Sequence, residues 1–223
     1  MVTLVDYGLG NIRAFENIYK RLNIPVRIAK TEAELSGATR LILPGVGAFD
    51  WAMQRLNESG MRACLDHLVT IEKRPVVGIC VGMQMVANSS DEGQLDGLKW
   101  IDAKVRRFDK STLCQQTCLP HMGWNDVTPQ RSNCLFHSME EPRFYFLHSY
   151  YFEPANEDSV LATTNYGGEF TSAVRLGNVF GVQFHPEKSH HWGIQLLRNF
   201  AEMDMDESGA AELAVKSAEN GIN

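Results

Sequence analysis

The sequence contains no uncharged run of about 18 apolar residues, which excludes a membrane-spanning helix of ordinary length. Its first seven residues lack the basic segment and the long apolar core of a secretory signal peptide, so we expect a cytoplasmic protein. Positive charge is scarce, since 21 lysines and arginines stand against 27 aspartates and glutamates, a net charge of −6. Binding to nucleic acid requires a basic face for the phosphates, so nucleic acid is not expected as a partner.

Cysteine is also sparse, with five in 223 residues. Their odd number and irregular spacing indicate free thiols rather than a disulfide framework. Cys114, Cys118 and His121 have a Cys-x3-Cys-x2-His spacing that resembles part of a zinc site. No fourth ligand is apparent in the sequence, and we therefore expect neither a metal nor a cofactor.

The first half of the chain alternates short apolar runs with segments of helical periodicity. Thr31 and Glu34 have the spacing of a capping box at the start of one short helix. Strands are expected at 2–5, 25–29, 41–43 and 76–79, and longer helices at 11–22, 49–56 and 61–71. This alternation predicts right-handed crossovers and a parallel sheet, with the third strand stopped by Pro44-Gly45.

The second half is richer in strand signals. These are an aromatic run at 143–152 and apolar segments at 160–164, 171–176 and 179–184. Gly177-Asn178 predicts a two-residue hairpin turn, and 192–200 has the pattern of a closing helix. We therefore expect one α/β domain over 1–202, with a central, mostly parallel sheet flanked by helices and an antiparallel, strand-rich second half. An acidic tail, 203–223, is expected to be flexible.

Cys80 carries the strongest chemical signal, because Gly78-Ile79-Cys80-Val81-Gly82 directly follows a buried strand. The pattern is that of a nucleophile elbow, a sharp strand-to-helix turn that strains the nucleophile's backbone and lifts its side chain above the sheet. Flanking glycines let neighbouring backbone approach closely, and the helix N-terminus favours a thiolate. The alternative interpretation is a buried structural cysteine in a glycine-flanked turn.

His185 and Glu187, in the segment Gln183-Phe184-His185-Pro186-Glu187, supply the partners that a thiol nucleophile needs. A base takes the thiol proton, and an acidic residue orients the base. In an extended chain, residues two apart lie on one face, so Glu187 could hold one ring nitrogen of His185 while the other faces Cys80. Alone, the segment is more typical of a surface turn, and it is its combination with the elbow that indicates catalysis. The order nucleophile, histidine, acid disfavours an α/β-hydrolase.

A glycine-rich turn, Pro44-Gly45-Val46-Gly47, follows the third expected strand. Backbone N–H groups at such a turn can stabilise an oxyanion, together with the amide of Val81. The alternative is an ordinary strand-to-helix turn. The turn lacks the lysine of a phosphate-binding loop, so a nucleotide site is not expected.

Taken together, these residues resemble class I (triad) glutamine amidotransferase domains, and the likeness extends from Val2 to Phe200. Within that class the chain is most similar to the glutaminase subunits of imidazole glycerol phosphate synthase. The motifs that carry the likeness are Asp6-Tyr7-Gly8-Leu9-Gly10-Asn11-Ile12-Arg13, Leu43-Pro44-Gly45-Val46-Gly47-Ala48-Phe49, Gly78-Ile79-Cys80-Val81-Gly82-Met83-Gln84, Pro120-His121-Met122-Gly123-Trp124-Asn125, Tyr145-Phe146-Leu147-His148-Ser149-Tyr150-Tyr151 and Phe184-His185-Pro186-Glu187-Lys188-Ser189.

The resemblance implies a role for each matching position. Cys80 would attack the glutamine carboxamide, with His185 as base and then acid and Glu187 as its orienting residue. Val46, Gly47 and Val81 would form the oxyanion hole. The residues implied to bind the substrate are Gln84, Glu92, His148, Ser149 and Tyr150, and those implied to lie near the partner interface and the ammonia exit are Trp124, Tyr145 and Lys188.

The resemblance further implies a heterodimer with a separate synthase or cyclase subunit, expected to be a (βα)₈ barrel, that receives the ammonia for histidine biosynthesis. The alternative keeps the glutaminase but changes its client to a sugar amidotransferase of a surface-polysaccharide pathway. A catalytically dead scaffold is disfavoured by the intact Cys80, His185 and Glu187. A cysteine peptidase is disfavoured by the glutamine-end motifs Gln84 and His148-Ser149-Tyr150.

Overall fold

The structure is a computed structural model that describes residues 1–109, 118–130 and 134–204. Its first half alternates strands and helices, as the sequence predicts. The strands are β1 (Val2–Val5), β2 (Val26–Ala29), β3 (Leu41–Gly45), β4 (Val76–Cys80) and β5 (Ser89–Ser90), and the helices are α1 (Ile12–Arg21), α2 (Glu32–Leu35), α3 (Phe49–Glu58), α4 (Arg62–Thr70) and α5 (Val81–Met85).

The second half is mainly strands and ends in a long helix. Its elements are β6 (Ala103–Arg107), β7 (His121–Asp126), β8 (Thr128–Pro129), β9 (Arg143–His148), β10 (Tyr150–Pro154), the 3₁₀ turn η1 (Glu157–Ser159), β11 (Val160–Asn165), β12 (Glu169–Leu176), β13 (Val179–Val182), the 3₁₀ turn η2 (Pro186–Lys188) and α6 (His190–Glu202).

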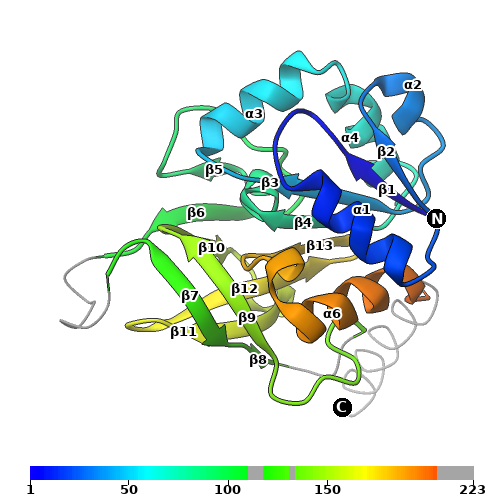
Figure 1. Ribbon diagram of the computed structural model, residues 1–223. Helices are drawn as coiled ribbons and strands as arrows, with labels where there is room; N and C mark the ends of the chain where they lie inside the picture. Colours follow the sequence, from blue (N-terminus) through cyan, green and yellow to red (C-terminus); the bar gives the residue numbers. More distant parts are fainter. Residues whose placement is uncertain (110–117, 131–133, 205–223) are drawn as a thin grey trace, which may run out of the picture.

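One large sheet runs through the described part of the chain in the order β2-β1-β3-β4-β13-β12-β10-β6-β5, with β11 and β8 attached beside β12. The five strands from β2 to β13 are parallel, whereas β13, β12, β10 and β6 pair antiparallel. Strands β7 and β9 form a second, antiparallel sheet (Figure 1). The expected α/β fold, with a mostly parallel core and an antiparallel second half, is confirmed.

Burial explains why the central strands form where they do. Every residue of β1, β3, β4 and β13 is buried, as expected for strands covered on both faces by other elements. In Figure 1, α1 and α6 lie side by side in front of the sheet, where the Tyr19 hydroxyl donates to the Leu197 carbonyl. The predicted hairpin at Gly177-Asn178 joins β12 to β13, with Leu176 paired to Val179.

Several local predictions need correction. Strand β3 continues through Pro44 to Gly45, because both residues still pair with β4. The aromatic run at 143–152 is two strands in different sheets, since the chain leaves β9 at His148 and joins β6 from Tyr150 onward. Strands β5 to β8 lie in segments for which the sequence pattern predicted no strand.

At the capping box, Thr31 accepts from the Glu34 N–H as expected. The Glu34 carboxylate accepts from the N–H of Lys30 rather than from that of Thr31.

The last part of the chain is described only at its beginning. Met203 is buried, and Arg40 donates to its carbonyl. The rest of the predicted acidic tail, 205–223, lies outside the described residues, as does Cys114 of the partial zinc-like motif.

Candidate active site

Cys80 occupies the sharp turn between β4 and α5, with a backbone φ of +54° that is rare for a residue with a side chain. The two flanking glycines are required by close backbone approach. A Cβ on Gly82 would lie 1.9 Å from the Leu43 carbonyl oxygen, and one on Gly78 would lie 2.5 Å from that of Gly82. The strained elbow predicted from the sequence is thus present, and it presents the Cys80 sulfur to a pocket of about 360 Å³.

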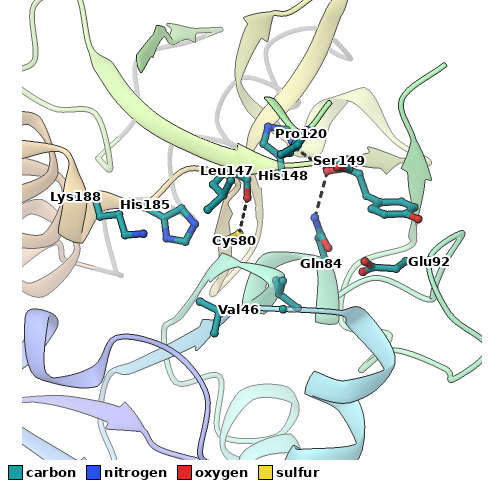
Figure 2. A pocket seen from close by; sticks show the side chains of 13 residues that line it. Val46, Cys80, Gln84, Glu92, Pro120, Leu147, His148, Ser149, His185 and Lys188 are labelled. Carbon is teal, nitrogen blue, oxygen red and sulfur yellow. Dashed lines mark hydrogen bonds between the residues drawn. The ribbon is translucent and has the colours of Figure 1, made fainter. Parts of the chain in front are cut away.

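His185 lines the same pocket, and Glu187 holds its ring from behind. The His185 Nδ1 lies 2.9 Å from the Glu187 Oε1, and both side chains are almost completely buried. The expectation of an extended segment is wrong, because Pro186–Lys188 is a 3₁₀ turn. The turn nevertheless brings the carboxylate back to the imidazole, and in Figure 2 the His185 ring lies beside Cys80.

The electrostatics of this group favour a protonated imidazole. Burial by itself lowers the pKa of His185, but hydrogen bonds and charge interactions with Cys80 and Glu187 outweigh it and raise the pKa to about 10. The second carboxylate oxygen of Glu187 is buried without a hydrogen-bond partner in the described part of the chain. Among the described residues, Glu187 therefore acts on the site through its hydrogen bond with His185.

The glycine turn after β3 lies against the nucleophile, because Gly45 pairs with Cys80 in the parallel ladder. Gly47 has a φ of +86° and open space where a Cβ would stand. Val46, Gly47 and Val81, the predicted oxyanion-hole residues, all line the pocket with Cys80. The hydroxyl of Tyr7, for which the sequence indicated no role, donates to the Pro44 carbonyl. Burial raises the pKa of that phenol, which keeps it a donor.

The five predicted substrate-binding residues also line this pocket: Gln84, Glu92, His148, Ser149 and Tyr150. Three of them are committed within the protein, and the ring nitrogens of His148 contact His121 and the Tyr150 carbonyl. One carboxylate oxygen of Glu92 accepts from the Phe49 N–H at the start of α3. The amide nitrogen of Gln84 donates to the Tyr150 carbonyl, the interaction drawn in Figure 2.

The residues predicted near a partner extend outward from the pocket along the small sheet. Lys188 lines the pocket and lies over the ring of Tyr145, with its amino group 5.6 Å from the ring centre. Tyr145 is paired with Trp124 across β7 and β9. Trp124 stacks on His190 and lines a separate surface hollow with Arg143 and Trp192. Pairwise contacts thus link the three side chains between the pocket and this separate hollow.

His121 is not positioned as a zinc ligand. Its ring is buried, with Nδ1 2.9 Å from the Nε2 of His148 and Nε2 3.2 Å from the Asn125 amide. No cluster of three potential metal ligands occurs among the residues that the structure describes. In the same residues, no helix is both long and apolar enough to cross a membrane.

Two contacts to the nucleophile were not predicted. The Leu147 carbonyl lies 3.9 Å from the Cys80 sulfur, and the Gln183 amide nitrogen lies 3.7 Å from it. Gln183 is the first residue of the segment that contains His185 and Glu187. Strand adjacency is the signal that could have identified Gln183 as a neighbour of Cys80, because Val182 at the end of β13 pairs with Ile79 of β4.

The sequence and the fold agree with those of known proteins. Residues 3–203 match the family model "Glutamine amidotransferase class-I". The chain is 61% identical to "Imidazole glycerol phosphate synthase subunit HisH" of Bdellovibrio bacteriovorus, over 91% of this chain and 100% of that protein. It is 41% identical to "Imidazole glycerol phosphate synthase hisHF, chloroplastic" of Arabidopsis thaliana, over 90% of this chain and 34% of that longer protein. A solved structure described as a glutamine amidotransferase superposes with a TM-score of 0.70 at 22% identity, over 90% of this chain and 97% of that one.

Proposed function

The chain belongs to the class I glutamine amidotransferase family, and from this premise we propose that it is the glutaminase subunit of an imidazole glycerol phosphate synthase. It hydrolyses glutamine to glutamate and ammonia. The observation that carries the assignment of the site is the buried contact between Glu187 and His185 beside a strained Cys80. We place the enzyme in the cytoplasm, where histidine biosynthesis supplies its client reaction.

In the proposed mechanism Cys80 attacks as the thiolate, the nucleophilic form of a cysteine. The His185 imidazole beside it is protonated at neutral pH, because its pKa is raised to about 10. The thiolate attacks the carboxamide carbon, and a C–S bond forms while the C=O electron pair moves to the oxygen. The N–H groups of Val81 and of the Val46-Gly47 turn stabilise that oxyanion.

Collapse of this intermediate breaks the C–N bond, and His185 gives its proton to the leaving nitrogen, which departs as ammonia. A glutamyl thioester remains on Cys80. A water molecule, deprotonated by the now neutral His185, attacks the thioester carbon, and glutamate leaves as the C–S bond breaks. Glu187 keeps its contact with the His185 ring and stabilises the imidazolium in both halves of the cycle.

The proposed partner is a cyclase subunit, expected to be a (βα)₈ barrel, that binds this chain as a heterodimer. Support comes from the longer Arabidopsis relative, of which this chain matches about a third. Within this chain, Trp124, Tyr145 and Lys188 extend from the pocket to the surface, the path expected of an interface and ammonia exit. The alternative client, a sugar amidotransferase, is not favoured, since relatives up to 61% identical bear the imidazole glycerol phosphate synthase name.

The test is reconstitution with the cyclase subunit of the same host. We expect a stable complex by size-exclusion chromatography, in which glutamine supports formation of the imidazole product. In a second experiment, the chain is mixed with the synthetase subunit of a sugar amidotransferase, which normally uses ammonia derived from glutamine. Complex formation and ammonia transfer in that experiment alone would replace the proposed client with the alternative.

A further inference from the structure

Gln183 lies fully buried next to the nucleophile, although it does not line the pocket. Its position follows from strand register, since Val182 of β13 pairs with Ile79 of β4. The residues that come next, Cys80 at the end of β4 and Gln183 just after β13, therefore lie side by side. The Gln183 amide nitrogen lies 3.7 Å from the Cys80 sulfur, within hydrogen-bonding range for sulfur.

The Tyr150 carbonyl fixes the orientation of the Gln183 side-chain amide through Gln84, which lies between them. The side-chain nitrogen of Gln84 lies 3.2 Å from the Tyr150 carbonyl oxygen, which can only accept. The same nitrogen lies 3.1 Å from the side-chain oxygen of Gln183. With its oxygen engaged by this donor, Gln183 must direct its own N–H at Cys80. The usual ambiguity between the two ends of an amide is thereby resolved.

The Tyr150 carbonyl is itself held by a pair of buried histidines. His148 Nδ1 lies 2.8 Å from that oxygen and must carry the hydrogen, so its Nε2 accepts from His121 across 2.9 Å. Burial lowers the pKa of His148 to about 3 and that of His121 to about 4, which keeps both rings neutral at working pH. Each ring thus donates once and accepts once, and the direction of the network does not change with pH near neutrality.

We propose that Gln183 is a further catalytic residue, whose amide N–H donates to the Cys80 sulfur, stabilises its thiolate form and aims it into the pocket. A hydrogen bond to the charged form of an acid favours that form. As the C–S bond forms, the negative charge moves from sulfur to the carboxamide oxygen, and the stabilisation passes to the oxyanion hole. The inference rests on the proposed role of Cys80 as the nucleophile.

The test measures alkylation of Cys80 by iodoacetamide as a function of pH, without glutamine, on the full chain. Site-resolved mass spectrometry separates Cys80 from Cys64, Cys118 and Cys134, which are free thiols. In Gln183→Met, which keeps the side-chain length but has no donor, we expect the midpoint of the reactivity curve to rise by about one pH unit. Gln183→Glu keeps an acceptor for Gln84 but places a carboxylate near the sulfur, so its midpoint should rise further.

Ser172→Ala is the matched control. Its hydroxyl is buried without a hydrogen-bond partner among the described residues, and its carbonyl, which accepts from the Gln183 N–H, is retained. This variant should keep the wild-type midpoint. Unchanged midpoints in both Gln183 variants would overturn the proposal, since a purely structural role alters stability but not this curve.

If circular dichroism shows that neither Gln183 variant folds, the alkylation curve of Gln84→Met tests the proposal instead. This change frees the Gln183 amide to rotate and should also raise the midpoint, whereas a wild-type curve would overturn the proposal. Because the assay uses no glutamine, its outcome is independent of the glutaminase assignment, which is tested by turnover of Cys80→Ala.

Discussion

The Tyr7 hydroxyl donates a hydrogen bond of 2.7 Å to the Pro44 carbonyl, and this contact ties the start of the glycine turn to the loop after β1. Gly45 is held as well, through its pairing with Cys80. Any rearrangement of the turn is therefore confined to the peptide units after Gly45. The N–H groups proposed to stabilise the oxyanion belong to that free part of the turn, at Val46 and Gly47.

We expect Tyr7→Phe to lower glutamine-dependent turnover of the complex several-fold, because the turn loses its anchor. Loss of the hydrogen bond should also reduce the free energy of unfolding by about 1 kcal/mol. Tyr19→Phe is the control, since its equally buried hydroxyl donates to Leu197 on α6. A similar loss of turnover in both variants would show that stability, rather than the turn, limits activity.

Gly47→Ala should change how strongly the partner activates the enzyme. We propose that the isolated chain hydrolyses glutamine slowly and that the partner, with its acceptor ligand bound, raises turnover about 10²–10³-fold by completing the oxyanion hole. Alanine is strained by about 1–2 kcal/mol at the Gly47 φ of +86°, although it meets no atoms there. The altered balance between turn conformations should change the ratio of stimulated to basal glutamate release.

Gly60→Ala provides the matched control for this change. Gly60 has a φ of +74° and equally open surroundings, but it lies between α3 and α4. Its substitution should cost similar stability and leave the stimulation ratio unchanged. Full glutaminase activity of the wild-type chain without any partner would contradict the proposed activation by the partner and favour a free-standing glutaminase.

Cys80→Ala should abolish glutamine-dependent synthesis by the complex and leave ammonia-dependent synthesis largely intact, because only the release of ammonia uses the thiol. Both activities are measured with the partner present. A glutamine-analogue electrophile such as a diazo-ketone should label Cys80 in the wild-type chain. Equal loss of both activities, or labelling of Cys64 or Cys134 instead, would refute the assignment.

His185→Asn should damage turnover far more than Glu187→Gln. Removal of the imidazole eliminates proton transfer and should cost about 10²–10⁴-fold, whereas a glutamine can still position the ring in part. Steady-state rates of glutamate release decide between the two, and the reverse ranking would mean that the roles are misassigned.

The contacts of His185 with Cys80 and Glu187 also predict a pH dependence of stability. The pKa of His185 is raised from 6.5 to about 10 in the folded chain, so its contribution is fully present below pH 6.5 and is lost as pH rises toward 10. The difference in unfolding free energy between the wild-type chain and Glu187→Gln should therefore shrink between pH 7 and 10. Chemical denaturation across this range measures the difference in unfolding free energy. A difference that grows with pH would contradict the prediction.

The buried histidine pair predicts the opposite behaviour at low pH. Burial lowers the pKa of His121 to about 4 and that of His148 to about 3, so the neutral rings favour folding above pH 6.5 and stability falls as pH drops below it. Replacing His121 with Gln should reduce the stability lost between pH 7 and 4.5 by about 2 kcal/mol. His67→Gln, at an exposed histidine, should leave the loss unchanged.

Much of the fold could be predicted because its first half has regular local signals. Buried apolar runs and helical periodicity located β1 to β4 and the helices between them. The break at Ser149 could not be predicted, since the aromatic residues on either side suit both sheets equally and only pairing partners distinguish them. Strand β6 alternates buried apolar residues with partly exposed basic ones over a short length, whereas β7 buries the polar His121 and exposes Met122 and Trp124, so neither strand has a clear apolar pattern.

At the site, local motifs indicated Cys80, His185 and the glycine turn, whereas residues that depend on strand adjacency remained unassigned. Gln183 and Tyr7 were both within recognised motifs, yet their contacts join segments about 100 and 37 residues apart in sequence. The interaction of His185 with Glu187 was predicted for an incorrect reason, because a 3₁₀ turn rather than an extended segment brings them together. Chemistry was thus more predictable than backbone geometry.

The glycine turn, the nucleophile and Gln183 lie at the carboxyl ends of three neighbouring parallel strands, β3, β4 and β13. Parallel neighbours in any sheet lie about 4.8 Å apart, a distance set by main-chain hydrogen bonding rather than by side chains. The lateral spacing of these three groups is therefore a property of the sheet itself. An engineer who wishes to redirect this scaffold toward another amide can exchange the residues that follow each strand while the spacing of the reacting groups stays constant.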